Sequence, residues 1–113
     1  MPTGSSQLAS VPRGAAVPSL VRWGLSSDAD LVFRTIVTMG ARSARLLGTE
    51  LGLPARRVDD ALAELHTAGA VTPVLGGGRS GGRGQLWLVR SATEAVANVR
   101  ARRLRHVNRE AQA

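Results

Sequence analysis

The sequence predicts a small α+β fold, mainly α, in which three helices precede a two-stranded β-hairpin and one more helix follows. Three observations lead to this prediction. Apolar residues recur at helical spacing in three segments, two short β-prone runs flank a glycine-rich loop, and a capping motif opens a last helical segment. At 113 residues, the chain has room for a single domain.

The first helix is expected to have Ser27 as its N-cap and to end at Gly40. A serine at this position can accept hydrogen bonds from the free backbone amides of the first turn, and Asp28 and Asp30 suit the positive end of the helix dipole. Glycine at the end tolerates the backbone reversal that terminates a helix. The face expected to be buried consists of Ala29, Val32, Phe33, Ile36 and Val37.

The next two helices are expected to form a helix-turn-helix. Ser43 begins the second, Gly52 and Pro54 end it, and the third runs from about Pro54 to Ala68. The apolar stripe of the third helix consists of Val58, Ala61, Leu62 and Leu65. The opposite stripe consists of Arg56, Asp60, Ala63 and Thr67. Two helices with a tight glycine-containing turn form this motif, although the same spacing also occurs in ordinary helical hairpins.

A β-hairpin is expected directly after the third helix. Residues 71–75 and 85–89 have strand composition, and Pro73 favours an edge position for the first of them. The connecting loop, residues 76–84, contains six glycines with Arg79 and Arg83, which predicts a flexible basic tip. Three helices followed by such a hairpin indicate a winged helix-turn-helix.

The remaining boundaries follow from capping and composition. Ser91 to Glu94 forms a capping box, so a last helix is expected over 91–106. The winged helix-turn-helix domain is assigned to 23–90. A flexible basic arm is expected at 1–22 and a frayed tail at 107–113, because the first is rich in Ser, Gly, Pro and Ala and the second is polar.

Charge and composition restrict the function. All 15 basic residues are arginine, the net charge is +7, and the region 71–113 holds eight arginines against two glutamates. This basic third suits an anionic partner. The absence of cysteine fits a reducing cytoplasm, and no apolar run is long enough for a membrane helix. Neither a catalytic constellation nor metal-ligand spacing is present, so we expect no enzyme activity, no metal and no cofactor.

Parts of the sequence resemble a known family. Residues 25–36, the stretch 51–65 that begins Leu-Gly-Leu-Pro, and residues 68–71 are similar to actinobacterial winged-helix transcriptional regulators. The likeness is chiefly to TrmB-type N-terminal domains of LuxR-like regulators and more loosely to MarR and ArsR types. It covers residues 23–90 and implies sequence-specific binding of double-stranded DNA in the cytoplasm, on the nucleoid. It also implies a homodimer through the last helix, whereas no sensor domain follows, so a small-molecule effector is not expected.

The candidate contacts lie on the second and third helices and on the wing. Arg56 and Arg57 could meet phosphates or guanine edges, and Asp60 could accept from a cytosine amino group, although an ion pair with Arg56 is favoured. Arg79 and Arg83 could follow a phosphate backbone or enter a narrow minor groove. The full candidate set is Arg42, Ser43, Arg45, Ala55, Arg56, Arg57, Asp60, Arg79, Ser80 and Arg83.

A protein- or peptide-binding module is the alternative from a different functional class. Winged-helix folds also recognise peptides, and such a module would use a strand edge and apolar surface. The last helix adds arginines that either extend a DNA-binding face or meet an acidic protein partner. These arginines are Arg100, Arg102, Arg105 and Arg109.

Overall fold

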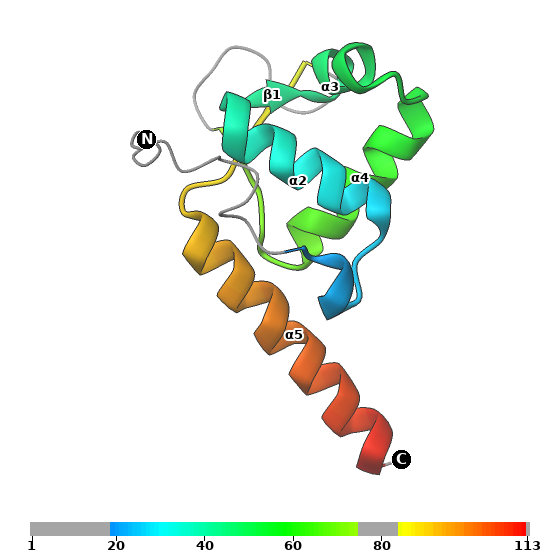
Figure 1. Ribbon diagram of the computed structural model, residues 1–113, viewed down its shortest axis with the longest axis vertical. Coiled ribbons are helices and arrows are strands. Elements are labelled where there is room, and N and C mark those ends of the chain that lie inside the picture. The colour runs from blue at the N-terminus through cyan, green and yellow to red at the C-terminus, as the bar shows by residue number, and fades with distance from the viewer. Residues whose placement is uncertain (1–18, 75–83, 113) are drawn as a thin grey trace, which may run out of the picture.

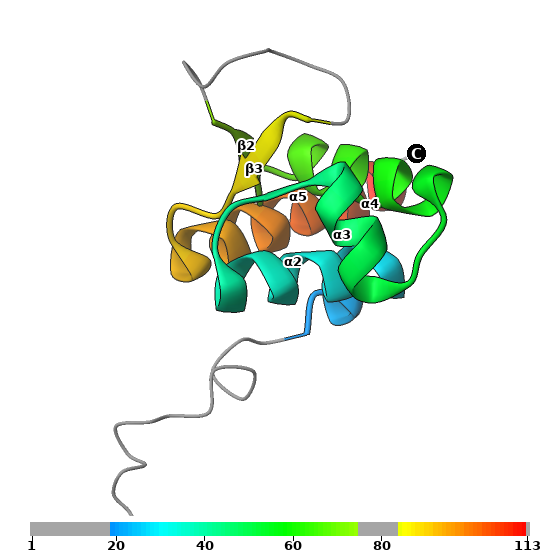
Figure 2. The ribbon, with the colours of Figure 1, turned by 90° about the horizontal axis from the view of Figure 1, so that it is seen from above.

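The computed structural model describes residues 19–74 and 84–112, and these form a mainly helical winged helix-turn-helix, which confirms the predicted fold class (Figure 1). Helices α2, α3 and α4 pack together, a small sheet lies beside them, and α5 runs away from the body (Figures 1 and 2). In chain order the elements are η2 (Val21–Trp23), α2 (Ser27–Met39), β1 (Arg42–Ser43), α3 (Ala44–Leu51), α4 (Ala55–Thr67), β2 (Thr72–Pro73), β3 (Leu86–Leu88) and α5 (Ala92–Gln112).

The sheet has three antiparallel strands in the order β1-β3-β2, one more than the sequence predicts. The added strand, β1, pairs Arg42 with Trp87 across the ladder. It is two residues long and has no β-pattern of its own, so only its partner defines it as a strand. Pro73 lies on β2, which is an edge strand as expected. The tip predicted at residues 76–84 lies outside the described residues except for Gly84.

Among the first three helices, the N-terminal end differs from expectation at two. Ser26, not Ser27, caps α2, since its side-chain oxygen accepts from the Ala29 amide at 3.1 Å. Ser43 caps α3 as predicted and accepts from the Leu46 amide at 3.1 Å. Pro54 precedes α4 instead of opening it, and its extended backbone turns the chain into the helix.

The predicted apolar faces form the core. In α4 the full predicted stripe is buried, and in α2 all of it is buried except Val37, which is half-buried. The turn between α3 and α4 contains Gly52 at φ 68°, a left-handed conformation that glycine adopts without strain. The core residues of these three helices are Ala29, Val32, Phe33, Ile36, Ala44, Leu47, Val58, Ala61, Leu62 and Leu65.

The folded body begins before residue 23, within the segment expected to be a flexible arm. Leu20 is fully buried, and its amide donates to Asp30 Oδ1 at 2.8 Å. The η2 turn follows it and packs against α5. A single leucine in a Ser- and Pro-rich stretch has no periodic partner, so the sequence pattern does not reveal that it is buried.

Helix α5 continues to Gln112, past the end predicted at His106, so residues 107–112 are helical instead of frayed. An ion pair between His106 Nε2 and Glu110 Oε2 at 3.2 Å spans one turn of this extension. The first half of α5 is fixed to the body by buried Val99 and by Asn98, which donates to the Gly69 carbonyl at 2.9 Å. The second half projects from the body (Figure 1).

Two polar links fasten α4 to α2 along one flank. Arg57 Nη2 and Nε donate to the two Asp28 carboxylate oxygens at 2.7 and 2.8 Å. Closer to the end of α4, Glu64 accepts from the Ser26 amide and hydroxyl, both at 2.7 Å. Together with the shared apolar core, these links fix the rotation of α4 about its axis.

We expect Leu20→Ala to lower the free energy of unfolding by about 2–4 kcal/mol, because it empties a fully buried site. Urea denaturation measures this change. Val21→Ala is the matched control, since Val21 is 48% exposed and should cost less than about 0.5 kcal/mol. Equal small effects of both substitutions would show that Leu20 does not belong to the core.

The link between Asp28 and Arg57 predicts a pH dependence of stability. Hydrogen bonds from Arg57 hold the pKa of the Asp28 carboxyl below its usual range. The pair therefore stabilises the fold fully above the unfolded pKa of about 3.9, and the benefit is lost as the pH falls through the lower folded pKa. Asp28→Asn should lower the melting temperature at pH 6 and have progressively less effect below pH 4.

The control for this pH series is Asp60→Asn, which removes an exposed carboxylate that forms no ion pair among the described residues. Its melting curves should follow those of the wild type at every pH. A melting-temperature difference for Asp28→Asn that stays constant down to pH 2 would contradict a charge-dependent link.

Candidate nucleic-acid interface

The polar side chains of α4 are divided among three directions. On the α2 flank, Arg57 and Glu64 are occupied by the links to α2. On the sheet flank, His66 meets Trp87 of β3 edge-on, with ring centroids 5.2 Å apart and an interplanar angle of 64°. These two rings and Asp59 help to line a hollow of about 240 Å³ between α4 and the sheet.

The third direction, opposite the buried stripe, is the outward face of α4. It consists of Arg56, Asp60, Ala63 and Thr67, all exposed. The ion pair expected between Arg56 and Asp60 does not form, since no ion pair within residues 19–74 and 84–112 joins them. Two exposed side chains of opposite charge therefore lie one helical turn apart, and neither has a hydrogen-bonded partner in the described part of the chain.

Arg57 forms a contact within the fold that the sequence did not predict. Its guanidinium group binds Asp28 in a two-pronged contact, and the hydrogen bonds raise the pKa of Arg57 above its usual range. Such bidentate pairs are the strong form of Arg–carboxylate contact. Arg57 thus holds the first turn of α4 in place instead of standing free beside Arg56.

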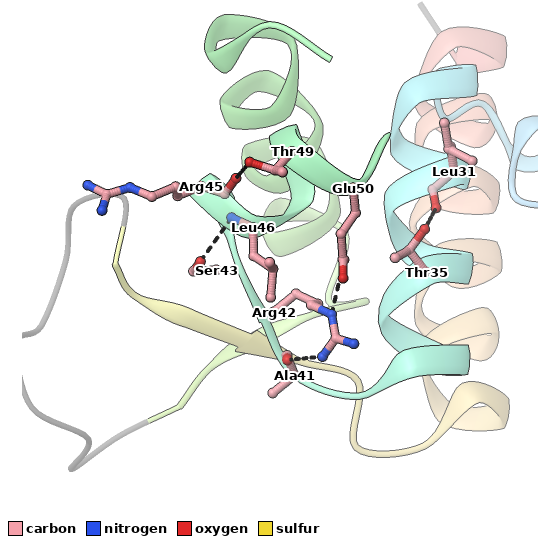
Figure 3. Close-up of polar contacts among 9 residues, drawn as sticks. All are labelled: Leu31, Thr35, Ala41, Arg42, Ser43, Arg45, Leu46, Thr49 and Glu50. Carbon is pink, nitrogen blue, oxygen red and sulfur yellow. Dashed lines mark hydrogen bonds and ion pairs between the residues drawn. The ribbon is translucent and has the colours of Figure 1, made fainter. Parts of the chain in front are cut away.

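Arg42 and Ser43 are likewise occupied by contacts within the fold (Figure 3). Arg42 donates to Glu50 Oε1 at 3.1 Å and to the Ala41 carbonyl at 2.9 Å, and its side chain is only 18% exposed. The Ser43 hydroxyl accepts from the Leu46 amide as the cap of α3. These two residues position the start of α3.

Arg45 differs from its neighbours. It is exposed, and in Figure 3 its guanidinium group extends away from the contacts that surround Arg42. Within the described part of the chain, neither the Arg45 nor the Arg56 guanidinium group has a hydrogen-bonded partner. One available arginine thus lies on each helix of the helix-turn-helix, and exposed Ala55 adds no bulk at the first turn of α4.

Three further candidates, Arg79, Ser80 and Arg83, lie outside the described residues. Within the described residues, the sequence did not reveal that Asp28 binds Arg57, that Glu50 binds Arg42 and that Glu64 accepts from Ser26. Each of these contacts joins separate elements, and a local pattern of charges gives no signal for such a pairing.

The described residues contain neither a cluster of metal-ligating side chains nor a helix that could span a membrane. No three His, Cys, Asp or Glu side chains come together there as a metal site would require. In the same part of the chain, each helix is too short or too polar to cross a membrane.

No protein-family model matches the sequence, and no curated protein matches it significantly. A crystal structure of a MarR-family transcription regulator has a similar fold, with a TM-score of 0.58 and 16% sequence identity, over 96% of this chain and 71% of that chain. At this identity the likeness shows the fold. That fold is the winged helix expected from the sequence, and the likeness does not single out TrmB-type domains.

Proposed function

We propose that this protein is a transcriptional regulator that binds double-stranded DNA sequence-specifically, with α4 in the major groove. The outward face of α4 is the observation that carries this proposal. Within residues 19–74 and 84–112, the other sides of the helix contact the core, α2 and the sheet, and the exposed stripe keeps one donor and one acceptor without a partner. The fold of the MarR-family neighbour supports the same class.

The chemistry of this stripe suits base edges. Arg56 can donate two hydrogen bonds to guanine, and Asp60 can accept one from the amino group of cytosine. Ala63 is small enough to allow close approach to the groove floor. Asp59 and Asp60 also repel phosphate, so α4 contributes selectivity, while affinity comes from basic residues elsewhere.

Backbone contacts are assigned to Arg45 on α3 and to Arg79, Ser80 and Arg83 of the wing. Arg45 is exposed and has no partner among the described residues, and it lies beside the start of α3, where a phosphate would also meet the free amides of the first turn. The composition of the wing supports a role in DNA contact, since two arginines on a glycine-rich segment can adapt to a phosphate backbone or a minor groove.

The proposal includes a homodimer through α5, acting on the nucleoid in the cytoplasm. Leu104 and Val107, 56% and 41% exposed, lie on the half of α5 that projects from the body. A second copy would cover these apolar side chains. Two copies related by a two-fold axis would then present two α4 helices to a palindromic site.

A peptide-binding module is the second candidate function. The hollow between α4 and β3 favours it, because Leu62, Ala63, His66 and Trp87 give it a partly apolar lining that could take one side chain of a peptide. Peptide binding there would depend weakly on salt, whereas DNA binding depends on it steeply.

Replacing Arg56 with alanine should cost about 1–3 kcal/mol of binding free energy on the preferred duplex and much less on random duplex. The preferred duplex is first selected from a random library, and both affinities are measured by fluorescence anisotropy. Arg90→Ala, which removes an exposed arginine away from α4, is the control and should change both affinities equally. Equal weakening by Arg56→Ala on both duplexes would assign Arg56 to phosphate.

Replacing Arg79 and Arg83 together with alanine should weaken duplex binding at least tenfold. The slope of log K against log salt should become shallower by about two units, since each lost phosphate contact removes about 0.9. Paired salt titrations measure both values, and thermal melting should be unchanged. An affinity equal to that of the wild type would remove the wing from the DNA contact and favour the peptide-binding candidate.

A further inference from the structure

Three arginines gather at the contact between η2 and α5. The guanidinium carbon of Arg22 lies 5.2 Å from the centre of the Trp23 ring, and that of Arg100 lies 5.1 Å from it. Arg103 lies against the next residue, Gly24, with its Cδ 3.4 Å from the position that a Cβ would occupy there. We call Arg22, Arg100 and Arg103 the η2–α5 cluster.

The charge of the η2–α5 cluster is not balanced within the fold. Among the described residues, none of its three arginines forms an ion pair. The sequence contains no acid in residues 19–27 or in residues 95–109, and Glu110 beyond them is paired with His106. Attraction to the indole ring stabilises the two stacked guanidinium groups but leaves their positive charge available to a ligand.

Stacking on Trp23 orients the guanidinium groups of Arg22 and Arg100 so that they can bind an oxyanion. A guanidinium group that lies over an aromatic ring loses rotational freedom, while its N–H edges remain available for two parallel hydrogen bonds to phosphate. Trp23 is half-buried and two guanidinium groups already lie over it, so the ring is not free to stack on a nucleobase. The cluster is therefore suited to a backbone and not to unpaired bases.

The position of the cluster separates it from the proposed reading helix. Figure 2 shows α4 with strands β2 and β3 on one side of the body and η2 on the other side, beyond α2. The cluster does not lie on the outward stripe of α4 but beyond its α2 flank, where Ser26 contacts Glu64.

We propose that the η2–α5 cluster is a second DNA-binding surface, which holds the phosphate backbone of a separate duplex segment. This inference rests on the proposed function, which brings DNA to the protein. An acidic protein is the less favoured partner, because protein interfaces bury an apolar centre, whereas three arginines and a covered ring form the centre of this surface.

The test needs to separate this surface from α4. Ala63→Glu places an acid on the outward face of α4 and should block duplex binding there. Arg22→Gln/Arg100→Gln removes two charges of the cluster but keeps the aliphatic stems over Trp23. Arg102→Gln/Arg109→Gln removes the same charge from the opposite side of α5, since these positions lie about 180–200° around the helix from Arg100. Thermal melting and light scattering verify that each variant has the wild-type fold and oligomeric state.

Binding of a random-sequence duplex is titrated against salt for Ala63→Glu alone and with each double substitution. Ala63→Glu should retain duplex binding, and adding Arg22→Gln/Arg100→Gln should weaken it at least tenfold and make the salt slope shallower by about two units. Adding Arg102→Gln/Arg109→Gln should weaken it no more than about threefold. Wild-type protein should also capture a labelled duplex on beads that carry another duplex, and Arg22→Gln/Arg100→Gln should abolish this capture.

Three outcomes would overturn the proposal. Equal weakening by the two double substitutions would reduce the cluster to general positive charge. Binding of polyglutamate, but not of duplex, by Ala63→Glu would assign the surface to an acidic protein. Loss of all duplex binding in Ala63→Glu, with site-specific binding intact in the wild type, would reject this surface and leave the proposed function standing. Conversely, Ala63→Glu that binds every duplex as tightly as the wild type, and loses binding with Arg22→Gln/Arg100→Gln, would support the cluster and reject the reading role of α4.

Discussion

The attachment of α4 to α2 is the constraint on which the proposed function depends. A helix with a buried stripe can still rotate by some tens of degrees about its axis, and such a rotation would change which side chains it presents. The contact of Arg57 with Asp28 and that of Glu64 with Ser26 lie on one flank, and the contact of His66 with Trp87 lies on the other. With both flanks held, the stripe from Arg56 to Thr67 is the part of α4 that a ligand can reach.

The same contacts distinguish arginines that stabilise the fold from arginines that remain available to a ligand. Arg42 on β1 binds Glu50 in the last turn of α3, and Arg57 in the first turn of α4 binds Asp28 of α2. Arg45 and Arg56 have no such partner in the described part of the chain and remain available. A net charge of +7 therefore overstates the charge that α3 and α4 offer to DNA, and the acids on α4 reduce it further. This is the physical reason to assign selectivity to α4 and affinity to the wing and other basic residues.

Periodicity in the sequence predicts the helices and the core well, because each buried stripe repeats within one segment. The stripes of α2 and α4 are examples, as is the cap at Ser43. The errors arise where the deciding contact lies far away in the sequence. Two adjacent serines compete to cap α2, and the link from Ser26 to Glu64 stabilises the choice of the first. Leu20 is buried by packing that no local pattern reveals, and β1 exists only through β3.

In the candidate site, too, local features are predictable from the sequence and contacts between distant residues are not. The outward stripe of α4 is predictable from helical geometry alone, and the structure leaves it exposed. Which of its neighbours are available is not predictable, because the partners of Arg42 and Arg57 come from α3 and α2. The expected pair of Arg56 with Asp60 has the right spacing but does not form, since spacing permits an exposed pair and contributes little energy to it.

An amide NMR titration with a selected duplex tests the central claim most directly, because it locates the contact without any substitution. If the outward face of α4 reads DNA, the first amide signals to shift should be those of Asp60, Ala63 and Thr67 on α4 and of Arg45 on α3. These shifts should occur below one equivalent of DNA. Signals of Phe33 and Leu65 in the core should stay in place. Shifts confined to His66 and the Trp87 indole, with the outward face of α4 unchanged, would contradict the claim that this face reads DNA.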